Sequence, residues 1–124
     1  VFESDTLDVR NWVVDFGSLK SLKGLLEDTF DHTMLVAEDD PHREALQGLQ
    51  TLGLARIVIV PATGCEAFAE LIYYTTEIWL QDNGYAPRVR LQSVEVKEHG
   101  ANSAIYSESK WHSFTIHRNP ITNL

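Results

Sequence analysis

With 124 residues, 44% of them hydrophobic, the chain fits one globular domain with a substantial core. Ten basic and eighteen acidic residues give a formal net charge of -8, and no cluster of Lys and Arg is able to neutralise several neighbouring phosphates, which argues against a nucleic-acid partner. No apolar run approaches the roughly 18–20 residues of a membrane span, and nothing at the start resembles a signal peptide. The single Cys65 excludes an internal disulfide framework. We therefore expect a cytoplasmic protein without a membrane partner.

The beginning of the chain predicts a strand, a turn and a helix. Val1–Ser4 has strand character, residues 5–8 form a polar turn, and Trp12–Phe16 is predicted to be a short extended run that leads into the helix. Ser18 can cap that helix. Its apolar residues are spaced by three and four positions and form one buried stripe: Leu19, Leu22, Leu25, Leu26 and Phe30. The helix ends close to Asp31 and His32.

A second, shorter helix is predicted between Asp40 and Gly53. Asp40 precedes Pro41, and proline is favoured at the first helical position, so this pair is expected to set the N-terminal end. Downstream, Ile57–Val60 is a β-branched run that Pro61 stops, which predicts a strand. A long amphipathic helix ending near Gly84 follows, with these apolar-face positions: Phe68, Leu71, Ile72, Thr75, Ile78 and Trp79.

The last third predicts β-structure. Apolar residues alternate imperfectly with polar ones from Val89 to Val96, and Gly100–Asn102 turns the chain into Ser103–Tyr106, which predicts a hairpin. The final segment, 111–116, has strand character or is an extension packed on a neighbour. The predicted class is therefore α+β with a mainly antiparallel sheet.

An adjacent acid and imidazole, Asp31 and His32, are the first candidate site residues. Asp can orient and charge-stabilise a neighbouring His, and His transfers protons near neutral pH. The alternatives are a solvated surface pair or a His32 that interacts favourably with the dipole at the helix end.

Four segments, in this order, resemble the 6-pyruvoyl-tetrahydropterin synthase family, including its bacterial branch, the 6-carboxy-tetrahydropterin synthases of the deazapurine (queuosine) pathway. They are Val14-Asp15-Phe16 with the helix after it, Asp31-His32, the segment Pro61–Glu66, and the strand ending in Glu98. The resemblance covers Val1 to Tyr106. It implies the tunnelling fold, in which an antiparallel sheet with helices packed on one face assembles into an oligomeric barrel with active sites between subunits.

The resemblance also implies an activity. Asp31 and His32 would belong to a catalytic triad acting on 7,8-dihydroneopterin triphosphate, with a Cys on an upstream loop as third member. A zinc ion held by histidines is implied too, but its ligands are not identifiable in this chain, because His42, His99, His112 and His117 are scattered and suit surface or packing roles. We therefore expect residues 1–124 to form a single pterin-synthase-like domain without its N-terminal strand and metal-ligand segment.

Glu98 would anchor the pterin, because a carboxylate accepts two parallel N–H bonds from an amino-pyrimidine edge. The alternative is an exposed strand-end Glu paired with Lys97 or Arg90, which stabilises little. Thr63 and Glu66 would contact the substrate, although their spacing also fits a structural capping box. The upstream Cys of the implied triad is not in this chain, so Cys65 either replaces it as the nucleophile or is an inert thiol.

The preferred prediction is a zinc-dependent lyase of the 6-carboxy-tetrahydropterin synthase type, a cytoplasmic homo-oligomer that binds a small pterin. One alternative is 6-pyruvoyl-tetrahydropterin synthase activity. A second is a non-catalytic homologue that binds a pterin or purine or serves as an assembly subunit. A third is another tunnelling-fold enzyme acting on a different bicyclic heterocycle.

Overall fold

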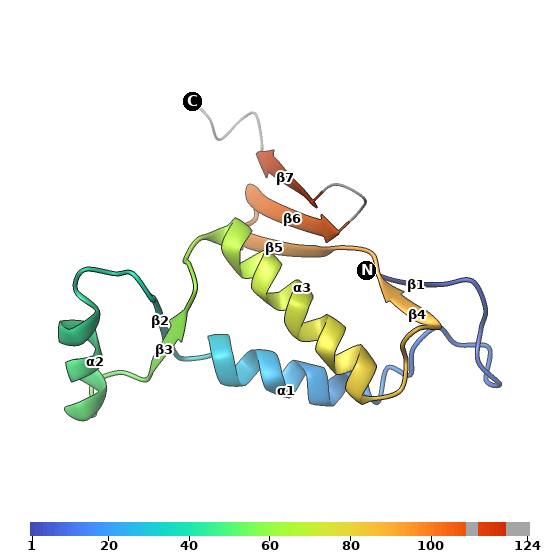
Figure 1. Cartoon of the computed structure of the whole chain (residues 1–124), viewed down its shortest axis with the longest axis horizontal. Coiled ribbons are helices and arrows are strands. Elements are labelled where there is room, and N and C mark those ends of the chain that lie inside the picture. Colours follow the sequence, from blue (N-terminus) through green and yellow to red (C-terminus); the bar gives the residue numbers. More distant parts are fainter. Residues whose placement is uncertain (109–111, 119–124) are drawn as a thin grey trace.

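A long helix, α3 (Cys65–Asp82), crosses the middle of the molecule, with α1 (Leu19–Phe30) on one side and β-strands on the other (Figure 1). The computed structural model describes residues 1–108 and 112–118. In this part of the chain, none of the helices is long and apolar enough to cross a membrane.

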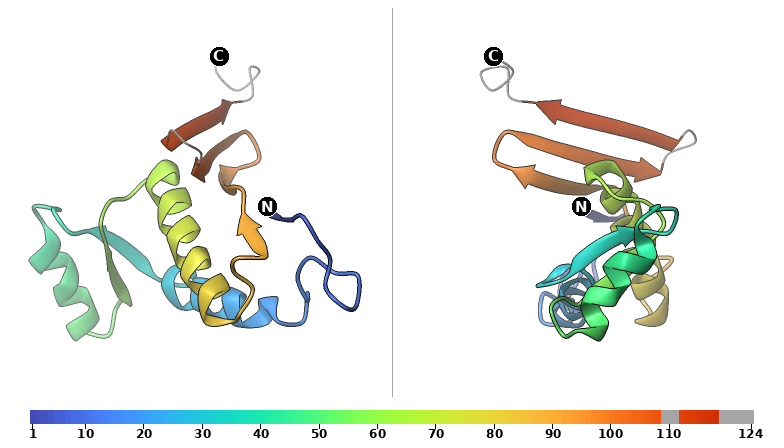
Figure 2. Two further views of the ribbon diagram at one scale, coloured as in Figure 1. Left: turned by 45° about the vertical axis from the view of Figure 1, so that its right-hand side comes forward. Right: turned by 90° about the vertical axis from the view of Figure 1, so that its left-hand side faces the viewer.

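The described strands form three small sheets. The antiparallel pair is β1 (Phe2–Ser4) with β4 (Val89–Leu91), the parallel pair is β2 (Met34–Ala37) with β3 (Ile57–Val60), and the antiparallel three-stranded sheet has the order β5 (Val94–His99), β6 (Asn102–Glu108), β7 (His112–Arg118). The helix α2 (Arg43–Thr51) connects β2 to β3, and this unit extends to one side of α1, away from the three-stranded sheet (Figures 1 and 2). The architecture is therefore α+β with mainly antiparallel pairing.

The core lies where α3 packs against α1 and the strands β4 and β6. It contains these buried residues: Val14, Leu22, Ala69, Tyr73, Trp79, Leu80, Val89, Leu91 and Tyr106. The indole N–H of Trp79 donates to the Ser21 hydroxyl at 2.8 Å, which joins α3 to α1. The Tyr73 hydroxyl donates to the Leu91 carbonyl at 3.1 Å, which joins α3 to β4. Burial of each large side chain stabilises the fold by about 1.5–3 kcal/mol.

The predicted extended run at Trp12–Phe16 is wrong, because this segment forms bends and turns. Aspartate carboxylates accept hydrogen bonds from backbone N–H groups nearby in the sequence. Asp8 accepts hydrogen bonds from the N–H groups of Arg10 and Trp12 at 2.8 and 3.0 Å, and Asp15 accepts one from Gly17 at 2.8 Å. Such side-chain bonds compete with strand pairing.

The two helices predicted in the N-terminal half, α1 and α2, both form, but their N-terminal ends differ from the prediction. Ser18 does precede α1, yet its hydroxyl donates to the Asp15 carbonyl at 2.7 Å and makes no cap bond to the helix. The start of α2 is at Arg43 rather than Pro41, because the Asp40 carboxylate accepts a hydrogen bond from the His42 N–H at 2.8 Å and holds a turn there.

The C-terminal half follows the prediction more closely. The structure confirms the long helix, the β5–β6 hairpin, and strand character near residues 111–116, where β7 pairs with β6 along its length. The run from Val89 to Val96 is not one strand, however. It divides at Gln92–Ser93, where the Gln92 N–H donates to the Val1 carbonyl at 2.8 Å and β4 pairs with β1. Trp111 lies outside the described residues.

Candidate active site

Asp31 and His32 contact each other at the end of α1. The backbone N–H of Asp31 donates to the Glu27 carbonyl at 2.8 Å and ends the helix. His32 has a φ of 54°, a left-handed conformation that costs a residue with a Cβ about 1–2 kcal/mol. His32 Nδ1 lies 2.9 Å from Asp31 Oδ1, and the side chains are 93% and 61% exposed. The pair is thus formed within the chain, and it is open to solvent on the isolated subunit.

Glu66 and Glu98 line one hollow of about 570 Å³ between the first turn of α3 and the β5–β6 hairpin. Two of the residues that the resemblance suggests as substrate contacts therefore border the same hollow. Thr63 is exposed and is not part of this wall. Gly64, with a φ of 114°, precedes the helix, and no side-chain cap hydrogen bond forms there. The capping-box alternative for Thr63 and Glu66 is consequently wrong.

A β-bulge lies at Glu98, beside the hollow. Lys97 pairs with Ser103, and His99 pairs with the preceding residue of β6, Asn102, so Glu98 is an extra residue without a cross-strand partner. A bulge interrupts the alternation of side chains along a strand. The three consecutive residues Val96, Lys97 and Glu98 all line the hollow. The sequence pattern shows no sign of this irregularity.

Cys65 lies in the same hollow and is held by its neighbours. Its thiol donates to the Val96 carbonyl at 3.6 Å. Burial raises the pKa of the Cys65 thiol, and the negative charges of Glu98 and Glu66 raise it further. The start of α3 would favour a thiolate, but these influences outweigh it. A thiol that stays protonated near neutral pH is a poor nucleophile, which favours the inert alternative for Cys65.

The two parts of the candidate site adjoin. Asp31 lines a second hollow, of about 520 Å³, beside the end of α1. Phe68 and Val96 form part of the walls of both hollows. The acid–imidazole pair and the two carboxylates therefore lie on neighbouring parts of one surface.

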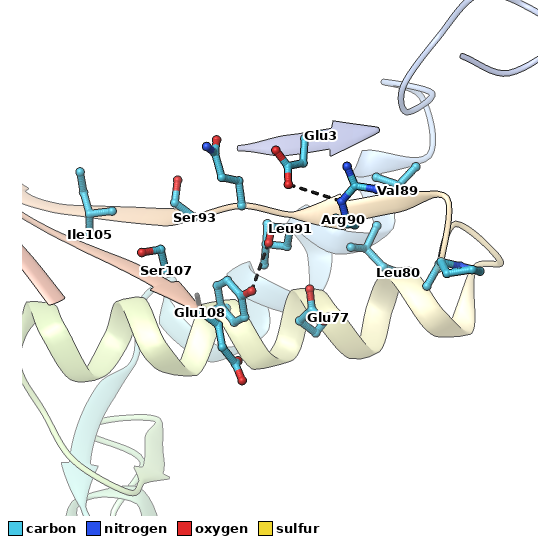
Figure 3. A pocket seen from close by; sticks show the side chains of 14 residues that line it. Glu3, Glu77, Leu80, Val89, Arg90, Leu91, Ser93, Ile105, Ser107 and Glu108 are labelled. Atoms are coloured by element: carbon cyan, nitrogen blue, oxygen red, sulfur yellow. Dashed lines mark hydrogen bonds and ion pairs between the residues drawn. The ribbon is translucent and has the colours of Figure 1, made fainter. Parts of the chain in front are cut away.

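A third hollow, of about 760 Å³, lies between α3 and the strands β4 and β6 (Figure 3). Burial and the charge of Glu108 raise the pKa of Glu77, and a hydrogen bond from the Leu91 backbone opposes that rise. Arg90 Nε lies 3.4 Å from Glu3 Oε1 at its edge. None of the candidate site residues lines this hollow, so we place the active site elsewhere.

Side chains that could bind a metal ion do not form a cluster among the described residues. Within the described residues, there is no group of three or more His, Cys, Asp or Glu side chains that fits a metal ion. The described residues therefore do not fit the zinc ion that the resemblance implies.

Comparison with known protein families gives a direct match. The family model described as 6-pyruvoyl tetrahydropterin synthase matches residues 1–109.

The chain belongs to this family.

A relative within the 6-pyruvoyl tetrahydropterin synthase family comes from Aquifex aeolicus (strain VF5) and is named 6-carboxy-5,6,7,8-tetrahydropterin synthase. It is 31% identical over 110 residues, which are 85% of this chain and 66% of the relative. The chain thus spans slightly less than two thirds of that relative's length. No solved structure gives a significant match. Membership of the family confirms the resemblance.

Proposed function

We propose that the protein is a 6-carboxy-5,6,7,8-tetrahydropterin synthase-like enzyme that acts on 7,8-dihydroneopterin triphosphate in deazapurine (queuosine) or pterin biosynthesis. One observation carries the proposal: the hollow that contains Glu66 and Glu98 adjoins the hollow beside Asp31. A ligand lying across both would have its ring at the carboxylates and its side chain near the acid–imidazole pair. The name of the Aquifex relative supports the carboxy product.

In this proposal Glu98 holds the pterin ring. Its carboxylate accepts two parallel N–H bonds, from the exocyclic amine and the adjacent ring nitrogen. Glu66 is a second acceptor from the helix side of the hollow. Thr63 does not line the hollow, but it lies two residues before Cys65, which does. It therefore remains a predicted contact at the edge of the site.

Asp31 and His32 perform the proton transfer. Asp31 orients the imidazole and stabilises its positive charge, while His32 moves a proton at a carbon atom of the substrate. Both side chains are largely exposed. We therefore propose that a neighbouring subunit covers this end of α1 and excludes water, as in the oligomeric barrel that the family resemblance implies.

Glu98→Ala tests the binding step by calorimetry with a pterin. Loss of the charged hydrogen bonds should weaken binding by about 2–3 kcal/mol. Glu95→Ala is the matched control, because Glu95 lies on the same strand and does not line the hollow. Unchanged affinity of the Glu98 variant would refute the anchor.

Turnover of 7,8-dihydroneopterin triphosphate by the full-length protein tests the reaction, and the product mass separates the carboxy from the pyruvoyl outcome. A second candidate is a non-catalytic homologue that binds a pterin or purine, and the lack of a metal-ligand group in the described residues favours it. Pterin binding without turnover would support that candidate.

A further inference from the structure

We propose that Lys97 contributes to the specificity of the pterin site, by donating a hydrogen bond to the ring carbonyl oxygen next to the two N–H groups that Glu98 holds. This inference rests on the proposed function, in which Glu98 is the anchor. It assigns to Lys97 a share of the preference for a 2-amino-4-oxo ring over a 2,4-diamino ring, in addition to the share that Glu98 supplies.

The bulge on β5 is the structural basis. Lys97 pairs with Ser103, whereas Glu98 has no cross-strand partner, and both residues line the hollow. Their Cα atoms are about 3.8 Å apart, as in any trans peptide. A bulge interrupts the strict alternation of side chains along a strand, so neighbouring side chains can share one side. The bulge therefore presents a cation and an anion side by side to the same ligand.

The hydrogen-bonding capacities of these two side chains are complementary. An ionised Glu98 only accepts, and a protonated Lys97 only donates. Among the described residues that line the hollow, Lys97 is the only one with a positive charge, whereas Glu66 and Glu98 both carry negative charges. A ligand ring whose edge carries only hydrogen-bond donors would bind the carboxylates of Glu66 and Glu98. It would offer no acceptor to the ammonium group of Lys97.

The edge of a 2-amino-4-oxo ring has the matching order. Its exocyclic amine and ring N–H donate, and the carbonyl oxygen beside them accepts. In a 2,4-diamino ring an amino group replaces that oxygen, so a donor would face the donor Lys97. The neutral diamino ring also lacks the hydrogen on the ring nitrogen that Glu98 holds, so both side chains contribute to the preference. Polar groups left unpaired in a complex discriminate strongly between ligands.

The test compares the dissociation constants of 2-amino-4-oxopteridine and 2,4-diaminopteridine for the full-length protein by calorimetry. We expect the wild-type protein to prefer the oxo compound by about tenfold to a hundredfold, the range of a charged hydrogen bond. Lys97→Met should reduce this preference by about tenfold, mainly by weakening the binding of the oxo compound, while the share that Glu98 supplies remains. Lys97→Arg should retain most of the preference, since it keeps a charged donor.

Lys20→Met is the matched control, because it removes the same charge from an exposed position on α1 outside the hollow. It should leave both constants unchanged. An unaltered preference in Lys97→Met, or an equal loss for both compounds, would overturn the inference and leave Glu98 as anchor. If neither compound binds the wild-type protein, the proposed function fails as well.

Discussion

The ring of Phe30, the last residue of α1, meets the ring of Phe68 in α3 edge-on, with centroids 5.6 Å apart and planes inclined at 75°. Asp31 follows Phe30 directly, and Phe68 is part of the wall of both adjoining hollows. This contact therefore connects the acid–imidazole pair to the carboxylate hollow.

Phe68→Ala should lower the free energy of unfolding by about 2–3 kcal/mol, less than for a fully buried Phe because this ring is only half-buried. Urea titration measures that change. Pterin affinity and turnover should fall together, because the walls of both hollows change. Phe16→Ala is the control: Phe16 is 85% exposed, so its removal should change stability by less than about 0.5 kcal/mol. Normal affinity and turnover in a destabilised Phe68 variant would show that the contact is structural only.

His32→Gln should reduce the rate of the chemical step by about 10²–10⁴-fold, the usual contribution of a positioned acid–base group. Pterin affinity should remain within about twofold, since His32 does not line the carboxylate hollow. Single-turnover kinetics and calorimetry separate these two effects. His42→Gln, an exposed histidine before α2, should leave both unchanged. Equal losses of rate and affinity would contradict a role confined to proton transfer.

The Cys65 thiol can report on the charges of the site, and it is the only thiol in the chain. Glu98→Gln and Glu66→Gln should each lower the pKa of Cys65 toward its ordinary value, because each removes a charge that opposes the thiolate. The alkylation rate with iodoacetamide, measured against pH, gives that pKa. Glu95→Gln should leave the profile unchanged. A thiol pKa that is insensitive to both hollow-lining glutamates would place them farther from Cys65 than the structure does.

Glu77 makes stability depend on pH. Its pKa is raised in the folded state by burial and by Glu108, so folding favours the protonated form. Its contribution to the free energy of unfolding therefore falls as pH rises from the ordinary range of glutamate, about 4.3, through the raised value. Glu77→Gln should stabilise the protein near pH 7, and this gain should vanish below about pH 4. Urea midpoints of variant and wild type at the two pH values measure it, and an equal difference at both would contradict the raised pKa.

Local patterns were sufficient to predict that the helices α1 and α3 form, but not which side each helix buries. In α3, Ile78 of the predicted apolar face is 58% exposed, whereas Tyr73 and Leu80 are buried. In α1, Leu25 of the predicted stripe is 47% exposed and Leu22 is buried.

The contact between Asp31 and His32 was also predictable, because the two residues are adjacent in the sequence. The turns at Asp8, Asp15 and Asp40 were predictable in principle. Each of these carboxylates binds a backbone N–H two residues ahead, which is a known tendency of Asp.

The remaining features depend on pairing between distant segments. The strand β2 has only four residues, and its parallel partner β3 lies on the far side of α2. The bulge at Glu98 exists only in the register between β5 and β6, so the sequence suggested Lys97 as an ion-pair partner of Glu98 rather than as a residue of the site. Local hydrophobic periodicity carries no information about either relationship.

The parallel ladder of β2 and β3 sets the distance between the two sides of the candidate site. The first strand begins two residues after His32, and the second ends three residues before Thr63. A slip of one residue in this ladder would displace one side by about 3.3 Å and turn Val60 away from the core. No residue of α2 is buried. The length and composition of the segment 38–56 can thus change while the ladder keeps its register.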